Sequence, residues 1–247
     1  RERMKKGVSI VIATLALLAF WELASLALDK AFLPGPLISF KAFVALCADG
    51  EMWPQFGISA LRVLVSTALG VLLAVPLGLA CGRSEKLYHI ATPLVAILYP
   101  LPKVVFLPIL VVLFGLGNLP KIVLITLIIF FQIFVVVCDA AHQLPQESVD
   151  AMHTMSRRTW DVFRHLLMPA CLPQVLTSLR ISVGTSVAVL FFAETFASFD
   201  GLGYLILDGM ERREYPDMFA GIIGMALLGV LLYEIIYFVE KRCCRWL

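Results

Sequence analysis

The chain has 247 residues, of which 60% are hydrophobic and 15% are charged, and its formal net charge is +2. A soluble domain usually has about 45–50% apolar and about 25% charged residues, so the excess of apolar side chains here has to face lipid. The small net charge gives no basis for nucleic-acid binding. The composition therefore excludes an ordinary soluble protein and predicts one embedded in a lipid bilayer.

Six segments are apolar over the roughly 20 residues that a helix needs to cross a bilayer. The first follows a basic start, but it is longer than the core of a signal peptide, about 7–15 residues, so we expect a retained helix. The predicted fold class is all-α, a polytopic membrane protein with one transmembrane domain over residues 1–247. Residues 31–56, which contain three prolines, are expected to form a short amphipathic piece at the membrane interface. The six predicted transmembrane helices are residues 8–28, 60–81, 94–116, 119–138, 173–197 and 217–239.

Basic residues are unevenly distributed over the ends of these segments. With the N-terminus inside the cell, twelve Lys and Arg residues lie at inner ends and five at outer ends. Because cytoplasmic loops carry an excess of Lys and Arg, both termini and the segment 139–172 are expected to be cytoplasmic. Two further charged residues near helix ends, Glu22 and Arg62, are expected to extend their side chains toward the membrane–water interface.

The chain lacks the patterns that would make it an enzyme. It contains no G-x-x-x-x-G-K-[ST] sequence, the phosphate-binding loop of many ATPases. Its four histidines and six cysteines show no metal-ligand spacing. We therefore expect no catalytic residue, no metal and no cofactor in this chain.

The segment 139–172 is unusually long for a connection between two membrane helices. Apolar residues recur in it at intervals of three and four, which is typical of a helix with one apolar face. Long connections in compact proteins usually have a function. Either of two structures fits this pattern, a helix lying on the membrane surface or a docking element for a cytoplasmic partner. The residues of the apolar stripe are Val149, Met152, Met155, Trp160, Phe163, Leu166 and Leu167.

The spacing within this segment resembles a motif of ATP-driven (ABC-type) importer permeases. That motif reads E-A-A, three residues, G, nine residues, I-x-L-P. Here Asp150-Ala151-Met152 is followed after three residues by Ser156, and nine residues later by Leu166-Leu167-Met168-Pro169. The spacing is kept, although five letters differ. The stretches LPGP at 33–36, YPLPKVVFLPILVVLFGLG at 99–117 and AETFASFDGLGYLI at 193–206 are similar to permeases of the nitrate, sulfonate and taurine type.

The resemblance implies a binding-protein-dependent type I importer permease in the bacterial plasma (inner) membrane, crossing it several times. The implied partners are two ATP-binding cassette subunits, which hold the ATP and magnesium, an extracytoplasmic substrate-binding protein, and a second permease copy, giving a homodimer. The implied substrate is a small anion or organic acid such as a sulfonate, nitrate or taurine. Pro169 and Pro173 are expected to end the loop helix. The implied ATPase-coupling residues are Asp150, Ala151, Met152, Ser156, Arg157, Arg158, Leu166, Met168 and Pro169.

Charges and helix breakers inside predicted spans mark a candidate translocation path. A charge within a membrane is costly, and is by default a candidate for function. Where proline interrupts a membrane helix, it leaves backbone carbonyl groups without a hydrogen-bond donor, and these carbonyls have to face protein or water. Lys103 and Glu194 fit either of two roles, lining the path or bracing helices. The candidate path residues are Pro102, Lys103, Val105, Val187 and Glu194.

Two other classes of function remain as alternatives. A stand-alone secondary transporter or channel would show internal repeats and several intramembrane carboxylates, and no clear repeat is visible here. A membrane-embedded enzyme would need clustered His, Asp or Glu residues at membrane depth. The importer permease is the interpretation that the sequence favours.

Overall fold

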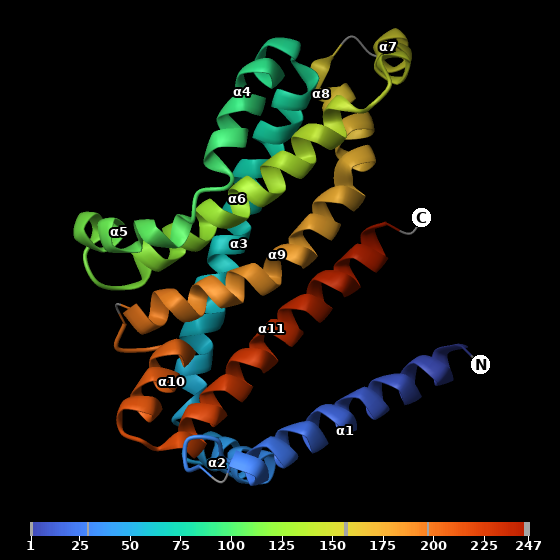
Figure 1. Ribbon diagram of the computed structural model, residues 1–247. Helices are drawn as coiled ribbons and strands as arrows, with labels where there is room; N and C mark the ends of the chain where they lie inside the picture. The colour runs from blue at the N-terminus through green and yellow to red at the C-terminus, as the bar shows by residue number, and fades with distance from the viewer. Residues whose placement is uncertain (1, 29, 156–157, 197, 245–247) are drawn as a thin grey trace. The chain divides into compact units, whose positions relative to one another are not determined.

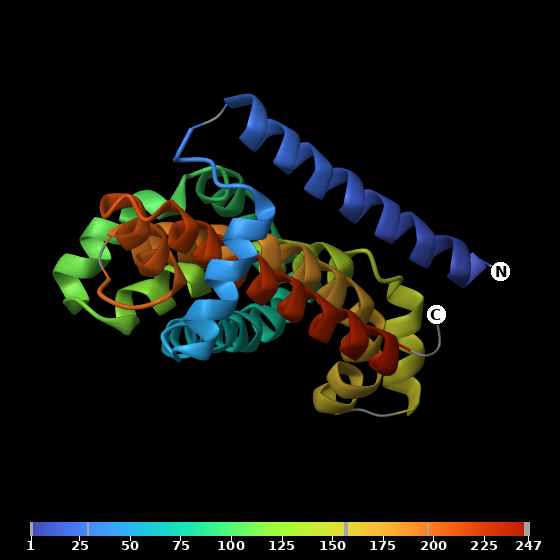
Figure 2. The same cartoon turned by 90° about the horizontal axis from the view of Figure 1, so that it is seen from below.

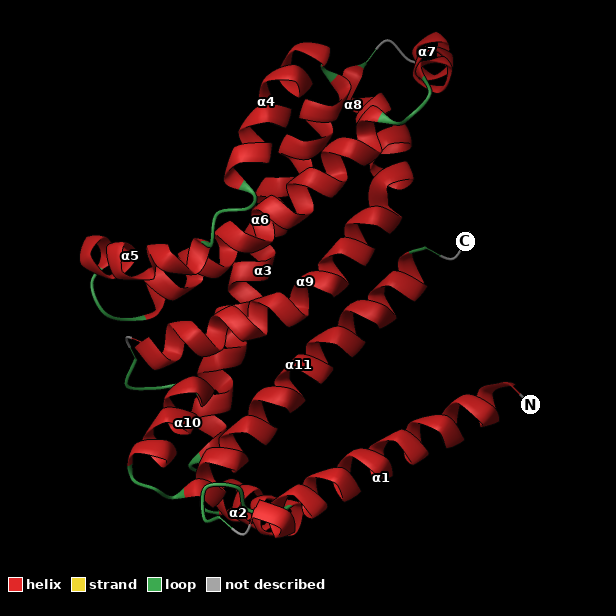
Figure 3. Cartoon of the chain, viewed as in Figure 1, coloured by secondary structure: helices red, strands yellow, loops and turns green. Residues whose placement is uncertain are grey.

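The computed structural model describes residues 2–28, 30–155, 158–196 and 198–244. These residues form helices joined by short connections, with no strand among them (Figure 3). The predicted all-α fold class is confirmed. In chain order the elements are α1 (Glu2–Leu28), α2 (Pro36–Ala48), α3 (Met52–Arg83), α4 (Glu85–Leu98), the 3₁₀ turn η1 (Lys103–Phe106), α5 (Leu107–Phe114), α6 (Asn118–His142), α7 (Gln146–Met155), α8 (Thr159–Val162), the π-helical turn η2 (Phe163–Leu167), α9 (Met168–Phe196), α10 (Leu202–Glu211) and α11 (Tyr215–Cys243).

Within the described ranges, five helices are long and apolar enough to cross a membrane. A sixth crossing exists if the bent pair formed by α4 and the η1–α5 segment counts as one span. The third span, predicted over 94–116 with helix breakers inside it, consists of two helical pieces, Glu85–Leu98 and Lys103–Phe114, that meet at a bend of 81°. The cause is local, since Pro100 and Pro102 cannot continue a helix. The five long spans are Val11–Leu28, Met52–Arg83, Asn118–His142, Trp160–Phe196 and Tyr215–Cys243.

The segment 139–172 also differs from the expected long connection. Helix α6 continues to His142, and α9 already begins at Met168. The expectation that Pro169 and Pro173 end a helix is wrong. Pro169 lies in the first turn of α9, where its missing N–H costs nothing, and Pro173 lies inside α9. Together α8, η2 and α9 form one apolar run over Trp160–Phe196.

The chain divides into two compact units, the first made of Arg1–Ile58 and Phe199–Ala226. In this unit Trp21 Nε1 donates a hydrogen bond to the carbonyl of Pro34 at 3.0 Å, which ties α1 to the turn before α2. Gly201, with φ of +102°, precedes α10, and its N–H donates to Gln55 Oε1 at 2.6 Å. The short helix α2 is present where an interfacial piece was expected.

The second unit consists of Ser59–Ser198 and Leu227–Leu247. Its core is the pair α6 and α9, which lie side by side over much of their length (Figures 1 and 2). Helix α3 packs against α6 through glycines whose missing side chains allow close approach. A Cβ on Gly78 would lie 3.0 Å from the side chain of Val137, and one on Gly82 would overlap the carbonyl of Cys138. The two helices therefore meet backbone to backbone near the C-terminal end of each.

We predict that Gly82→Ala destabilises this unit because the added methyl group collides with the α6 backbone rather than with a movable side chain. Overpacking of this kind costs typically about 1–3 kcal/mol. The thermal midpoint of the purified protein in detergent should fall by several degrees. Gly184→Ala in α9 is the matched control, because a Cβ there meets nothing within 4 Å. Equal midpoints for the two variants would contradict the close approach.

Candidate functional site

A buried ion pair joins α3 and α9 within the second unit. Arg62 Nη1 lies 2.7 Å from Glu194 Oε1, and both side chains are essentially inaccessible to solvent, at 1% and 0% exposure. The hydroxyl of Ser59, one turn before Arg62, donates to both carboxylate oxygens at 2.8 and 2.9 Å. Arg62 also donates from Nε and Nη2 to Asn118 Oδ1 at 2.8 and 2.7 Å. Three helices, α3, α6 and α9, are thus connected at one polar point.

This geometry corrects the expectation for Arg62 and favours one of the two roles for Glu194. Arg62 does not extend toward an interface, because its side chain is buried against a carboxylate. The buried Glu194 carboxylate accepts hydrogen bonds from Ser59 and Arg62, both on α3, and so braces α9 against α3. Lining of a path by Glu194 stays a prediction.

Lys103 lies at the break between α4 and η1. Its Nζ donates to the carbonyl of Tyr99 at 3.0 Å and to that of Leu98 at 3.3 Å. These carbonyls end α4, where intrahelical donors are missing. The ammonium group also lies over the rings of Tyr99 and Phe131, 5.4 and 4.9 Å from their centroids. Lys103 therefore satisfies the helix end that the proline break creates.

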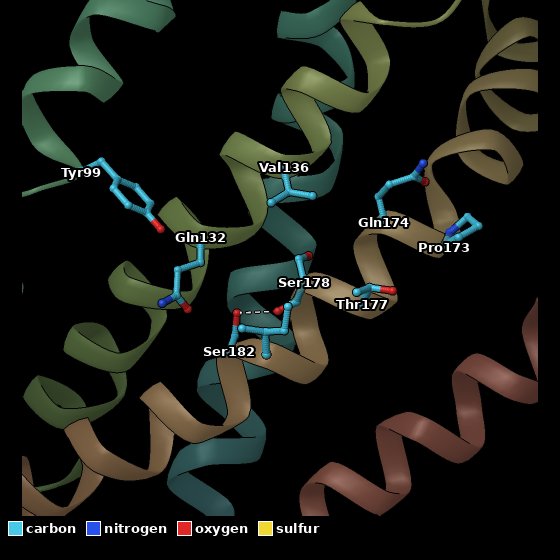
Figure 4. A pocket seen from close by; sticks show the side chains of 9 residues that line it. Tyr99, Gln132, Val136, Pro173, Gln174, Thr177, Ser178 and Ser182 are labelled. Atoms are coloured by element: carbon cyan, nitrogen blue, oxygen red, sulfur yellow. Dashed lines mark hydrogen bonds between the residues drawn. The ribbon is translucent and has the colours of Figure 1, made fainter.

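A pocket of about 380 Å³ lies between the end of α4 and the helices α6 and α9 (Figure 4). Within it, the ring of Tyr99 extends from the end of α4, and Gln132 faces α9 from α6. Most of the remaining lining comes from one face of α9. The lining residues are Tyr99, Gln132, Val136, Pro173, Gln174, Thr177, Ser178, Ile181 and Ser182.

The polar side chains of this pocket are only partly satisfied by the protein. Ser178 and Ser182 donate to carbonyls of their own helix, at 2.9 and 2.8 Å. Gln132 Nε2 donates to Thr185 Oγ1 at 3.3 Å, whereas Gln132 Oε1 is buried with no hydrogen-bond partner among the described atoms. Thr177 donates to Glu240 Oε1 at 3.0 Å, and Glu240 pairs with Arg180 at 3.2 Å. The pocket combines these polar side chains with a mostly apolar surface, and none of the residues that line it carries a formal charge.

None of the five path residues predicted from the sequence lines this pocket. Pro102 and Val105 are exposed near the break, Val105 at 65%. Val187 faces α11, where a Cβ on Gly229 would contact it at 3.7 Å. Lys103 does not line the pocket either, but its ammonium group lies over the ring of Tyr99, which does. Their part in a path remains a prediction.

The residues of the predicted coupling segment lie on α7, α8, η2 and the start of α9. Ser156 and Arg157 lie outside the described residues. Asp150, Ala151 and Arg158 are exposed, as is Met168, while Met152, Leu166 and Pro169 are half-buried. The apolar stripe is split between two surroundings. Val149 and Leu167 are buried, whereas Trp160 is 63% exposed and stacks on Phe163 with ring centroids 5.3 Å apart.

Arg83, at the end of α3, anchors the start of the coupling segment. Its Nη2 donates to Gln146 Oε1 at 2.6 Å, and Gln146 Nε2 donates to Asp150 Oδ1 at 3.0 Å. Nη1 reaches the carbonyls of Ala141 and Leu144 at 3.4 and 3.5 Å. A cavity of about 480 Å³ lies beneath, between the end of α3 and the inner faces of α7, α8 and η2. Asp150, the first residue of the motif, is thus connected to α3 through the side chains of Gln146 and Arg83.

Sequence reasoning missed the pocket residues and Arg83. A signal for the pocket exists, because polar residues at 174, 177, 178 and 182 follow helical spacing inside an otherwise apolar span. Gln132 is likewise an isolated amide in the apolar helix α6. No group of three or more His, Cys, Asp or Glu residues able to hold a metal occurs in the part of the chain that the structure describes.

The spanning helices, the broken span and the helical segment α7–α8–η2 together have the architecture of a type I importer permease. The family model described as "Binding-protein-dependent transport system inner membrane component" matches residues 74–243. The chain belongs to this family. It is therefore a multi-pass inner membrane component of an ABC transporter and not itself an enzyme. The resemblance inferred from the coupling-segment spacing is confirmed.

Relatives match nearly the whole chain. The Escherichia coli protein "Taurine transport system permease protein TauC" is 28% identical over 98% of this chain and 91% of its own length. The Bacillus subtilis "Putative aliphatic sulfonates transport permease protein SsuC" is 26% identical over 87% of this chain and 78% of its own length. "Formylaminopyrimidine transport permease protein ThiX" of Halalkalibacterium halodurans is 26% identical over 99% of this chain and 98% of its own length.

A solved structure supports the fold. A chain of the inward-facing MetNI methionine ABC transporter superposes with a TM-score of 0.64 at 21% sequence identity. The match covers 75% of this chain and 93% of that chain. At this identity the likeness establishes the arrangement of helices and carries no statement about substrate.

We predict that breaking the Arg62–Glu194 pair from one side is more damaging than removing both charges. Removing one partner of a buried ion pair costs about 3–5 kcal/mol, because an uncompensated charge stays buried. Arg62→Met should therefore lower the thermal midpoint strongly, and the double variant Arg62→Met, Glu194→Leu should recover much of the loss. A double variant as unstable as the single one would show that the hydrogen bonds to Ser59 and Asn118 dominate instead.

Proposed function

We propose that this chain forms the translocation path of an importer for small organic sulfonates or similar anions. Two ATP-binding cassette subunits, holding ATP and magnesium, would drive it, together with a second copy of this chain and an extracytoplasmic binding protein. The observation that carries the substrate class is the similarity over nearly the whole chain to taurine and aliphatic sulfonate permeases. Family membership favours this reading over a transporter that works alone.

The exposed part of the segment α7–α8–η2 supports a coupling role. Trp160 presents a large apolar surface to solvent beside Arg158 and Arg164, which are also exposed. An apolar anchor with a cationic rim suits insertion of a short helix into a groove of a partner. The link through Gln146 and Arg83 gives a direct connection from this surface to α3.

The orientation follows from the distribution of basic residues. Both termini and the segment α7–α8 are assigned to the cytoplasm, and α10 to the opposite side, because Lys and Arg concentrate at the former. Reporter tags after Leu247 and between Gln143 and Pro145 should read cytoplasmic, and one at Arg212–Arg213 should read extracytoplasmic. One contrary reading would overturn the order of crossings.

Reconstituted uptake tests the function. Proteoliposomes containing this chain, its ATPase subunits and its binding protein should accumulate labelled taurine or an aliphatic sulfonate only with hydrolysable ATP. An ATPase subunit unable to hydrolyse ATP is the control. Accumulation of a pyrimidine but no sulfonate would overturn the substrate class, and ATP-independent uptake by the chain alone would overturn the importer itself.

The coupling role predicts a specific defect for Arg83→Gln. Hydrogen bonds to charged groups contribute about 1.5–3 kcal/mol each, so the start of α7 should lose its fixed position against α3. Solute transported per ATP hydrolysed should fall several-fold while the complex still assembles. Lys86→Gln, an exposed basic residue one turn further along the same end of the molecule, is the matched control. Equal ratios in both variants would exclude Arg83 from coupling.

A further inference from the structure

We propose that Arg180 of α9, together with Tyr233 and Tyr237 of α11, binds the phosphate group of an anionic phospholipid. This goes beyond the transport function, since it assigns a lipid ligand to the protein. All three residues belong to the second unit. The guanidinium carbon of Arg180 lies 5.8 Å from the ring centroid of Tyr233 and 5.9 Å from that of Tyr237. The arginine therefore lies against two aromatic rings on one face of α11.

Arg180 has more hydrogen-bonding capacity than the protein uses. Its Nη1 lies 3.2 Å from Glu240 Oε2, but this oxygen has no aligned donor among the described atoms. A guanidinium carries five N–H donors, and none of those of Arg180 forms a hydrogen bond with another described residue. The side chain is 25% exposed. Unsatisfied donors in a membrane span are costly, so the guanidinium has to meet a ligand or water.

The depth of this cluster is that of lipid headgroups. Glu240 precedes the end of α11 at Cys243 by three residues, a rise of about 4.5 Å. Arg180, which contacts Glu240, is therefore close to the level at which α11 leaves the membrane. Tyrosine is enriched at this level, because its ring suits acyl chains and its hydroxyl suits headgroups. Tyr233 and Tyr237 are exposed, and their hydroxyls have no partner among the described residues.

The unused donors define a ligand with several anionic oxygens. A planar guanidinium binds phosphate through two parallel hydrogen bonds, and the two tyrosine hydroxyls are donors for further oxygens. Ile181 and Phe238, which follow Arg180 and Tyr237 in the chain, are exposed and give the adjoining apolar surface that acyl chains cover. A phospholipid matches both parts of this surface, whereas a free anion would leave the apolar part uncovered.

The charges near Arg180 favour an anionic headgroup over a zwitterionic one. Glu240 offsets the charge of Arg180, but Lys241 and Arg242 follow it in the last turn of α11 and are exposed. The other acidic residue of this part of α11, Glu234, lies about two turns earlier. Basic groups at this end of a span attract anionic lipids, and a choline group would bring a positive charge beside them. We therefore expect phosphatidylglycerol to bind in preference to phosphatidylcholine.

Native mass spectrometry of the full chain, purified with its copurifying subunits and titrated with either lipid in detergent, tests the proposal. Wild type should bind phosphatidylglycerol several-fold more tightly than phosphatidylcholine. Arg180→Gln should weaken phosphatidylglycerol binding by about tenfold, because charge-assisted hydrogen bonds are lost. Lys86→Gln, which removes an exposed basic residue of α4, is the matched control and should bind as wild type does.

Two further variants separate a lipid site from a structural contact, and they serve also if Arg180→Gln does not fold. Glu240→Gln removes the carboxylate that competes with phosphate for Arg180, and should tighten phosphatidylglycerol binding several-fold. The double variant Tyr233→Phe, Tyr237→Phe keeps the rings and removes the hydroxyls. It should weaken binding several-fold without changing the thermal midpoint in lipid-free detergent. A lower midpoint in Glu240→Gln with unchanged lipid affinity would show that the pair only braces α9 against α11.

The site is overturned by equal affinity for the two lipids, or by equal phosphatidylglycerol binding in wild type and Arg180→Gln. Displacement of phosphatidylglycerol by millimolar taurine or inorganic phosphate would also overturn it, since the ligand would then be a soluble anion. Binding to the single chain but not to its dimer would show that a second copy covers this face instead of a lipid.

Discussion

The interaction on which the second unit depends is the buried pair of Arg62 and Glu194. A guanidinium and a carboxylate without solvent attract each other strongly, and each would be left as an uncompensated charge if the other moved away. Ser59 and Asn118 bind the same two groups, so α3, α6 and α9 are held at one point. The glycine contacts between α3 and α6 hold the other end. Helices α3 and α6 are therefore joined at two points, and α9 is held to α3 at the first of them.

The bent span follows from a second constraint, that backbone polar groups in a membrane need partners. Prolines at 100 and 102 end α4 and leave its last carbonyls without donors. Lys103 supplies them from only one turn away. The ammonium group therefore has a local structural task, and this explains how a charge is tolerated at the bend. The break in turn brings Tyr99 to the edge of the pocket.

Much of the fold could be predicted because composition and apolar length are local properties. The all-α class and the positions of most spans followed from them, whereas the family followed from the motif spacing at 150–169 and the stretches similar to known permeases. The pairing of Arg62 with Glu194 could not, since the two lie 132 residues apart and nothing local distinguishes a buried arginine from an interfacial one. The continuity of α9 through Pro173 was missed for another reason. A π-helical turn before Met168 alters the local backbone pairing, so the prolines do not stop the helix. The pocket residues carried a helical spacing that could have been read, but only the structure placed Gln132 opposite them.

The unbroken run from Trp160 to Phe196 suggests how the coupling segment and the pocket beside Tyr99 would communicate. Its first turns belong to the coupling segment, its middle lines the pocket through residues 174 to 182, and its end holds Glu194. Because this run is continuous in the chain, a displacement of the coupling segment would be passed on to the residues further along α9. Closure of ATPase subunits against Trp160 would then move one wall of the pocket relative to Tyr99 on α4. Gln132 would follow, because its contact with Thr185 ties α6 to α9.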